Sequence, residues 1–198
     1  MSALAGLLVG AGHGRRAGGP KALRRAADGV LMWQVQVAAL RAAGCDPVVA
    51  VLHPAALEGA DVADLGAPWT LLAGDPDGSL FTSARHGLRW LAAATPGRQA
   101  LLLPVDCPWP GAAVLDALQA AIATAPASWR AARPIAYDAD ALRWRGGHPL
   151  LLAPQAWRSL CDGPDETRLD HWLAALPASE RLDVAVDEAA VLANLNGP

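Results

Sequence analysis

Cysteine is scarce in this chain of 198 residues, and its three cysteines, Cys45, Cys107 and Cys161, lie far apart. Their spacing matches neither a metal-binding motif nor a disulfide framework. The sequence therefore does not indicate a small disulfide-stabilised fold. Widely spaced free thiols suit a reducing compartment, so we expect a cytoplasmic protein.

Long apolar runs and an excess of positive charge are also missing. No apolar stretch reaches the length of a membrane span, and the N-terminus lacks the basic region and cleavage site of a signal peptide. The net charge is −3 and the pI is near 5.9, which argues against a general binder of nucleic acid or anionic membranes. We expect neither nucleic acid nor a membrane among the partners.

Two common catalytic motifs are absent. The chain has no Gly-x-Ser-x-Gly nucleophile elbow and no His-Glu-x-x-His zinc motif, which argues against those two classes of hydrolase. What is present is a hydrophobic content of 53%, enough for one substantial core. We therefore expect a single domain over residues 1–198.

Apolar runs of strand length alternate with segments of helical periodicity. Strands are predicted at 4–9, 47–52, 69–72, 99–105, 133–137, 148–152 and 182–186. Helices are predicted at 32–43, 55–63, 79–94, 112–123, 154–160 and 168–176. Repeated β-α-β units indicate an α/β fold, a mostly parallel sheet with helices on both faces and ligands at the carboxyl ends of its strands.

A glycine-rich loop follows the first strand. Five glycines fall within residues 10–19, and Arg15, Arg16 and Lys21 supply three cations with no acid among them. Glycine lets backbone approach a ligand closely, and N–H groups beside cations bind phosphate oxygens. The alternative is an ordinary surface loop with solvated charges.

Two known glycine-loop chemistries fit poorly. A P-loop needs Ser or Thr after Gly-Lys, whereas this loop ends Gly19-Pro20-Lys21-Ala22. A dinucleotide fingerprint needs an acidic residue after the second strand, which instead runs into His53-Pro54. A third interpretation of the loop rests on its resemblance to the signature of a known family.

The stretch from Leu7 to Lys21 resembles the Leu-Ala-Ala-Gly-x-x-x-Arg-Met-Gly-x-Pro-Lys signature of the molybdenum cofactor nucleotidyltransferase family, the cytidylyl- and guanylyltransferase branch. The resemblance implies a Rossmann-like nucleotidyltransferase fold. It makes Arg16 and Lys21 catalytic residues that hold the triphosphate. The remaining nucleotide-binding residues it implies in this loop are Val9, Gly10, Ala11, Gly12, His13, Gly14, Arg15, Gly18 and Gly19.

Asp106 directly follows the buried run Leu101 to Val105, so we expect it on the same sheet edge as the glycine loop. Read alone, it is either a helix-capping residue or a ligand for Mg²⁺. The segment Leu103-Pro104-Val105-Asp106-Cys107-Pro108 resembles the family's Leu-Pro-x-Asp-x-Pro, whose Asp holds the metal. The resemblance thus makes Asp106 catalytic.

Further stretches extend the resemblance. The segment around Ser79 to Leu88 is similar to a helix start that faces the nucleotide, which places Ser83 near the base or ribose; a hydroxyl bonded to its own helix is the alternative. The segment Arg145 to Leu150 resembles an Arg-x-Gly-His-Pro motif beside the second-substrate pocket, which gives His148 a pocket-shaping role. Arg168 aligns with an arginine of that pocket, although its surroundings differ from the family's.

The end of the chain departs from the pattern. Asn194 and Asn196 stand where the resemblance has carboxylates. An amide oxygen still ligates Mg²⁺ but carries no charge, so metal affinity should fall. Two amides in a terminal turn are the alternative.

Together, the resemblance implies Mg²⁺-dependent transfer of a nucleotidyl group from an NTP, with CTP slightly favoured over GTP, to a phosphorylated acceptor, the molybdopterin cofactor. A molybdoenzyme is then the partner that receives the product. Two rivals stay open: a sugar 1-phosphate as acceptor, or a nucleotide-binding maturation chaperone without turnover.

Overall fold

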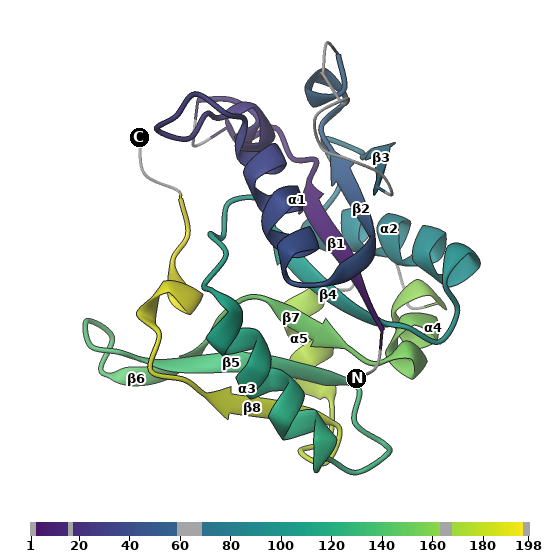
Figure 1. Ribbon diagram of the computed structural model, residues 1–198, viewed down its shortest axis with the longest axis vertical. Helices are drawn as coiled ribbons and strands as arrows, with labels where there is room; N and C mark the ends of the chain where they lie inside the picture. Colours follow the sequence, from purple (N-terminus) through teal and green to yellow (C-terminus); the bar gives the residue numbers. More distant parts are fainter. Residues whose placement is uncertain (1–2, 16–17, 59–68, 163–167, 196–198) are drawn as a thin grey trace.

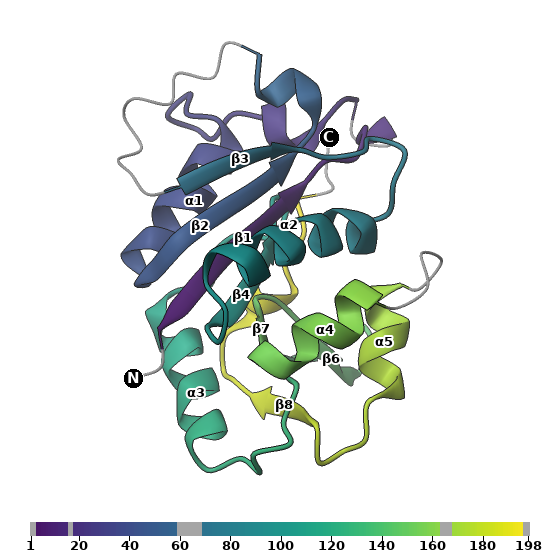
Figure 2. The same cartoon turned by 90° about the vertical axis from the view of Figure 1, so that its right-hand side faces the viewer.

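The computed structural model describes residues 3–15, 18–58, 69–162 and 168–195. Its centre is one sheet with the strand order β3-β2-β1-β4-β7-β5-β6, and β8 pairs with β5 beside this path (Figures 1 and 2). The strands are β1 Leu4–Gly10, β2 Cys45–Leu52, β3 Trp69–Ala73, β4 Gln99–Pro104, β5 Ala131–Asp138, β6 Arg143–Gly146, β7 Leu150–Leu152 and β8 Arg181–Ala185.

The sheet is mixed but mostly parallel in its first half. Strands β3, β2, β1 and β4 run parallel, as do β5 and β8. Strand β7 is antiparallel to both β4 and β5, and β6 is antiparallel to β5. The predicted α/β architecture is confirmed, and β4 is the border between its parallel and its antiparallel parts.

Helices cover both faces of the sheet, as predicted. Helices α1 (Met32–Ala42) and α3 (Ala112–Ala123) pack on one face. Helices α2 (Leu80–Ala94), α4 (Pro154–Asp162) and α5 (Leu169–Ala175) pack on the other. Short 3₁₀ turns are η2 (Lys21–Leu23), η3 (Pro54–Ala56) and η5 (Ala189–Leu192).

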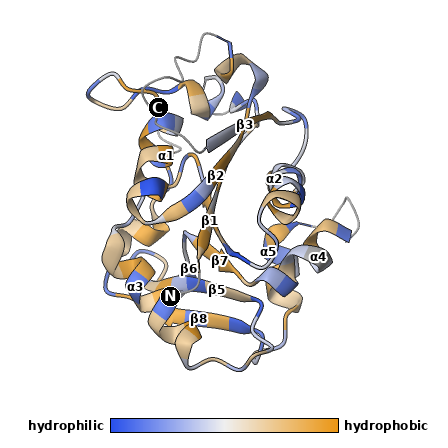
Figure 3. Cartoon of the chain, turned by 45° about the vertical axis from the view of Figure 1, so that its right-hand side comes forward, coloured by the Kyte–Doolittle hydropathy of each residue, from blue (hydrophilic) through white to orange (hydrophobic). Residues whose placement is uncertain are grey.

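The strands carry apolar side chains on both faces because both faces are covered. In β4, Leu101 and Leu103 join the core under α1 and α3, whereas Ala100 and Leu102 join the core under α2, α4 and α5. Figure 3 shows hydrophobic colour along the central strands and mixed colour on the helices. Strand β1 carries no charged residue, which is typical of a central parallel strand.

Two predicted elements need correction, and one strand was missed. The helix expected at 55–63 is only the 3₁₀ turn η3 where it is described, with the His53 ring accepting from the Ala55 N–H at 3.2 Å; residues 59–63 lie outside the described residues. The strand expected at 148–152 is shortened to β7. Strand β6 was not predicted, because all four of its residues are exposed and leave no apolar alternation.

No helix in the described part of the chain has both the length and the apolar composition needed to cross a membrane.

Candidate active site

The glycine loop leaves β1 and curls back on itself. The Gly19 N–H donates to the Gly14 carbonyl oxygen at 3.2 Å. Gly14 has a φ of +59°, and a Cβ there would lie 1.9 Å from the Gly19 carbonyl oxygen. Only glycine fits this position, so the local sequence determines the curl. Arg16, predicted to hold the triphosphate, lies outside the described residues.

Lys21 and Asp106, predicted independently from two motifs, meet in space. Lys21 opens η2 at the end of the loop, and Asp106 follows β4, whose Pro104 pairs with Val9 of β1. The Lys21 Nζ lies 2.5 Å from the Asp106 Oδ2, with side chains 24% and 14% exposed. Partial burial makes this ion pair stronger than a solvated one.

The helix-capping alternative for Asp106 is wrong. The N-cap residue of α3 is Gly111, and no side chain there accepts a hydrogen bond from the helix. The Asp106 carboxylate instead contacts Lys21, while its backbone carbonyl accepts from the Leu195 N–H at 2.8 Å.

A cavity of about 380 Å³, which we call the first cavity, opens at this sheet edge. Its walls bring together distant parts of the chain: the glycine loop, the start of α2, the end of β4 and the C-terminal segment. The predicted site residues that line it are Val9, Gly10, Ala11, Gly12, Gly14, Lys21, Ser83, Asp106, His148 and Asn194.

Asn194 lies at the first cavity because the next residue, Leu195, is held by hydrogen bonds at both its backbone N–H and its carbonyl group. The Leu195 N–H bonds to Asp106, and the Arg24 Nη1 donates to the Leu195 carbonyl at 2.7 Å. Asn196, its predicted companion, lies outside the described residues. Ser83 is buried near the start of α2, one turn after the N-cap Ser79, whose hydroxyl accepts from the Thr82 N–H at 3.1 Å.

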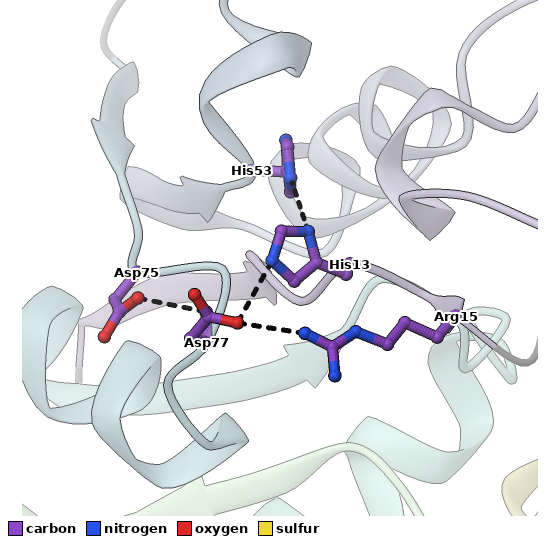
Figure 4. Close-up of polar contacts among 5 residues, drawn as sticks. All are labelled: His13, Arg15, His53, Asp75 and Asp77. Atoms are coloured by element: carbon purple, nitrogen blue, oxygen red, sulfur yellow. Dashed lines mark hydrogen bonds and ion pairs between the residues drawn. The ribbon is translucent and has the colours of Figure 1, made fainter.

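Four predicted loop residues do not line this cavity: His13, Arg15, Gly18 and Gly19. His13 and Arg15 both contact Asp77, which their Nε2 and Nη2 atoms approach to 3.2 Å at Oδ1 (Figure 4). His13 also lies against His53, with 3.4 Å between the His13 Nδ1 and the His53 Nε2. This polar cluster joins the glycine loop to the turn before α2, and the sequence did not predict its Asp77 or His53.

A second cavity, of about 500 Å³, adjoins the first. The two share Ser79, Leu80 and His148 as lining residues. The lining of the second cavity includes the apolar residues Phe81, Leu150, Leu169 and Leu173 and the charged residues Arg133, Arg168 and Asp170. The first cavity, which contains the Lys21–Asp106 pair, thus adjoins a second cavity that could hold another molecule.

His148 stands between the cavities as a neutral group. Its Nδ1 is buried with no hydrogen-bond partner among the described residues. Burial lowers the pKa of His148 to about 4, against an opposing effect of Asp106, and Arg133 lowers it further. The ring is therefore uncharged at neutral pH and shapes the passage rather than binding an anion by charge.

Arg168 lies at the rim of the second cavity. Its Nε and Nη2 donate to the two carboxylate oxygens of Asp170 at 3.0 and 3.1 Å, and both side chains are more than 60% exposed. That partner raises the pKa of the Arg168 guanidinium and lowers the pKa of Asp170. The sequence singled out Arg168 and missed Arg133, which is more enclosed.

The described residues contain no group of three or more His, Cys, Asp or Glu side chains arranged to hold a metal ion. The first cavity nevertheless suits Mg²⁺ bound together with phosphates. Such sites need only one or two protein oxygens, since substrate phosphates and water complete the octahedron. Asp106 offers a carboxylate there, and Asn194 an amide oxygen.

A family model described as a MobA-like NTP transferase domain matches residues 6–182. Among curated proteins, no relative is found.

Solved structures share the fold. The chain is similar to a nucleotidyl transferase from Methanothermobacter, with 22% identity, a TM-score of 0.70, and 98% of this chain and 92% of that chain covered. It is also similar to 4-diphosphocytidyl-2C-methyl-D-erythritol synthase from Anaerococcus prevotii, with 10% identity, a TM-score of 0.70, and 98% and 93% covered. A third is Rv0371c of Mycobacterium tuberculosis in complex with manganese, with 18% identity, a TM-score of 0.64, and 93% and 89% covered.

Proposed function

Because the chain belongs to the family of MobA-like NTP transferase domains, we propose that it transfers a nucleotidyl group from an NTP to the molybdopterin cofactor and releases pyrophosphate. The observation that carries this proposal is the Lys21–Asp106 pair, 2.5 Å apart in the first cavity, which adjoins the second. One cavity then holds the NTP and the other the phosphorylated acceptor.

The NTP lies in the first cavity, beside the glycine loop. The ammonium of Lys21 neutralises the triphosphate, and the loop's backbone N–H groups approach its oxygens. Arg16 adds a second charge from the same loop. Ser83 faces the nucleoside from the buried start of α2.

His13 and Arg15 support the glycine loop in this proposal and do not bind the nucleotide from within the first cavity. Both contact Asp77 outside the first cavity, so they brace the loop against the turn before α2. Because those contacts are exposed, each contributes about 0–1 kcal/mol, and a bound triphosphate can compete for Arg15.

The transfer needs alignment and charge neutralisation rather than a protein nucleophile. An oxygen of the acceptor phosphate attacks the α-phosphorus and forms the new P–O bond. The bond between the α-phosphorus and its bridging oxygen breaks, and that oxygen leaves with the electron pair on pyrophosphate. Lys21 stabilises the charge that develops there.

Asp106 and Asn194 would hold Mg²⁺ in the first cavity. A bound ion would supply positive charge that offsets the negative charge of the phosphates. Lys21 shares the Asp106 carboxylate through Oδ2, which leaves the other oxygen for the metal. Since Asn194 adds no charge, the affinity for Mg²⁺ depends on the nucleotide's own phosphates.

CTP is the proposed donor, because Ala11-Gly12 is similar to the Ala-Gly of the cytidylyl branch. A sugar 1-phosphate is the competing acceptor, and a chaperone without turnover is the competing function. A molybdoenzyme would receive the dinucleotide form of the cofactor.

One experiment separates these possibilities. Pyrophosphate release is measured for CTP, GTP, ATP and UTP, with molybdopterin or a sugar 1-phosphate, with and without Mg²⁺. We expect release only with molybdopterin and Mg²⁺, fastest with CTP. Release with the sugar phosphate would reassign the acceptor, and Mg²⁺-NTP binding without any release would favour the chaperone.

A further inference from the structure

Two arginines line the second cavity, and they differ in whether their carboxylate partner also lines it. At the rim, Arg168 is held by both oxygens of Asp170, and that carboxylate also lines the cavity. Deeper in, Arg133 lines the cavity, but its partner Asp183 does not. The rim therefore presents a nearly neutral pair, whereas the interior presents a cation with its counter-charge behind it.

Arg133 is held by both carboxylate oxygens of Asp183. It lies on β5, directly opposite Asp183 in the parallel pairing with β8. The Arg133 Nε donates to the Asp183 Oδ1 at 2.7 Å, and its Nη2 to Oδ2 at 3.4 Å. None of the described residues accepts a hydrogen bond from Nη1. The side chain is 27% exposed, so one edge of a preorganised guanidinium remains available.

Gly146 provides the seat for this guanidinium. A Cβ at position 146 would lie 2.5 Å from the Arg133 Nη1 and 2.6 Å from its Cζ. No larger residue fits while Arg133 keeps this position. The absence of a side chain at Gly146 thus permits the placement of Arg133.

The second cavity also leads from Arg133 to the reacting groups. His148 borders both cavities, and the charges of Arg133 and Asp106 both act on its ring. Since His148 is neutral at pH 7, the charge that attracts an anion in this passage comes from Arg133.

We propose that Arg133 binds the phosphate of the acceptor in the second cavity and orients it for attack on the NTP. This role rests on the proposed transfer reaction. A guanidinium edge suits phosphate oxygens in both charge and planar geometry. Arg133 exchanges no proton and forms no covalent bond, so it is a binding residue for the second substrate.

The decisive comparison is Arg133→Gln against Arg130→Gln. Arg130 directly precedes β5 and pairs with Glu180 at 2.7 Å, but it does not line the cavity. We expect Arg133→Gln to raise the KM for the acceptor by about 10- to 100-fold, the effect of losing a hydrogen bond to a charged group. The Kd for Mg²⁺-NTP, measured by calorimetry, should stay unchanged, and Arg130→Gln should match the unaltered protein in both.

A second variant tests the placement without removing charge. Gly146→Ala keeps the arginine but forces its guanidinium away, so the acceptor KM should rise as well, by less than in Arg133→Gln. Gly146→Ala also tests the proposal if Arg133→Gln fails to fold. An acceptor KM within twofold of the unaltered protein in both variants would overturn the proposal.

A binding measurement distinguishes failure of this inference from failure of the transfer reaction. Phenyl phosphate, a simple phosphate monoester, is titrated into the isotopically labelled protein while the Gly146 and Gly147 amide resonances are followed. We expect shifts that saturate and that disappear in Arg133→Gln, whether or not any NTP supports turnover. Equal shifts in both proteins would overturn the role of Arg133, whereas absent turnover with intact shifts would count only against the transfer reaction.

Discussion

His148 should make the folded protein sensitive to mild acid. Its buried Nδ1 has no partner among the described residues, and burial lowers its pKa from 6.5 to about 4. The unfolded chain takes up a proton near pH 6.5, whereas the folded chain resists it until about pH 4. The contribution to stability is therefore fully present above pH 6.5 and is lost as the pH falls through that window.

The magnitude follows from the two pKa values. Between pH 7 and pH 5 the free energy of unfolding should fall by about 2 kcal/mol through this residue alone, given a folded pKa of about 4. That is a large share of the 5–15 kcal/mol that is typical of a domain. Replacement by glutamine removes the titrating group and with it this part of the pH dependence.

The assay is urea unfolding at pH 5, 6, 7 and 8, without ligand, for the unaltered protein, His148→Gln and His86→Gln. His86 is exposed on α2, so its variant should follow the unaltered protein. Between pH 7 and pH 5, we expect the free energy of unfolding of His148→Gln to fall by about 2 kcal/mol less than that of the unaltered protein. Parallel curves for all three proteins would refute the assignment of a neutral, buried ring.

Three further predictions concern the proposed active site. Lys21→Ala should lower turnover by about 10²- to 10³-fold without unfolding the protein, since it removes a preorganised charge; turnover within a few fold of normal, at equal thermal stability, would exclude Lys21 from the reaction. Asp106→Ala should weaken Mg²⁺-dependent NTP binding in calorimetry, because the carboxylate is the one anionic ligand that we propose; unchanged binding would contradict a metal role. Asn194→Asp should lower the Mg²⁺ concentration for half-maximal rate, because a hard cation prefers an anionic oxygen; an unaltered Mg²⁺ dependence would mean that Asn194 only lines the cavity.

The sequence predicted the parallel half of the fold well because its local signals agree with its environment. Strand β1 is apolar throughout, and α2 begins after Ser79 and ends at Ala94 as expected. The sheet edge shared by the glycine loop and Asp106 followed from the predicted parallel arrangement of the strands. The contact between Lys21 and Asp106 spans 85 positions, and the two motifs placed both residues there.

The second half was harder to predict because its determinants are not local. Strand β6 has no apolar residue facing a core, so only its pairing with β5 identifies it. Arg133 is a lone cation in a mostly apolar stretch, and its meaning depends on Asp183, 50 positions away, and on the missing Cβ of Gly146. Asp77 and His53 meet His13 in the same long-range manner. The pattern of residues in a short stretch of sequence does not predict contacts between side chains that lie far apart along the chain.

The change of direction at β4 has a consequence for how such proteins diversify. Apart from Asn194, every residue that we assign to the NTP precedes Cys107. The lining residues of the second cavity follow Ala131, apart from Phe81 and from Ser79 and Leu80, which it shares with the first cavity. Within the sheet, the antiparallel strand β7 pairs with the parallel half through three residue pairs with β4. Exchange of residues 131–185 between relatives would therefore alter the choice of acceptor while the donor specificity is inherited unchanged, and chimeric chains would make that independence measurable.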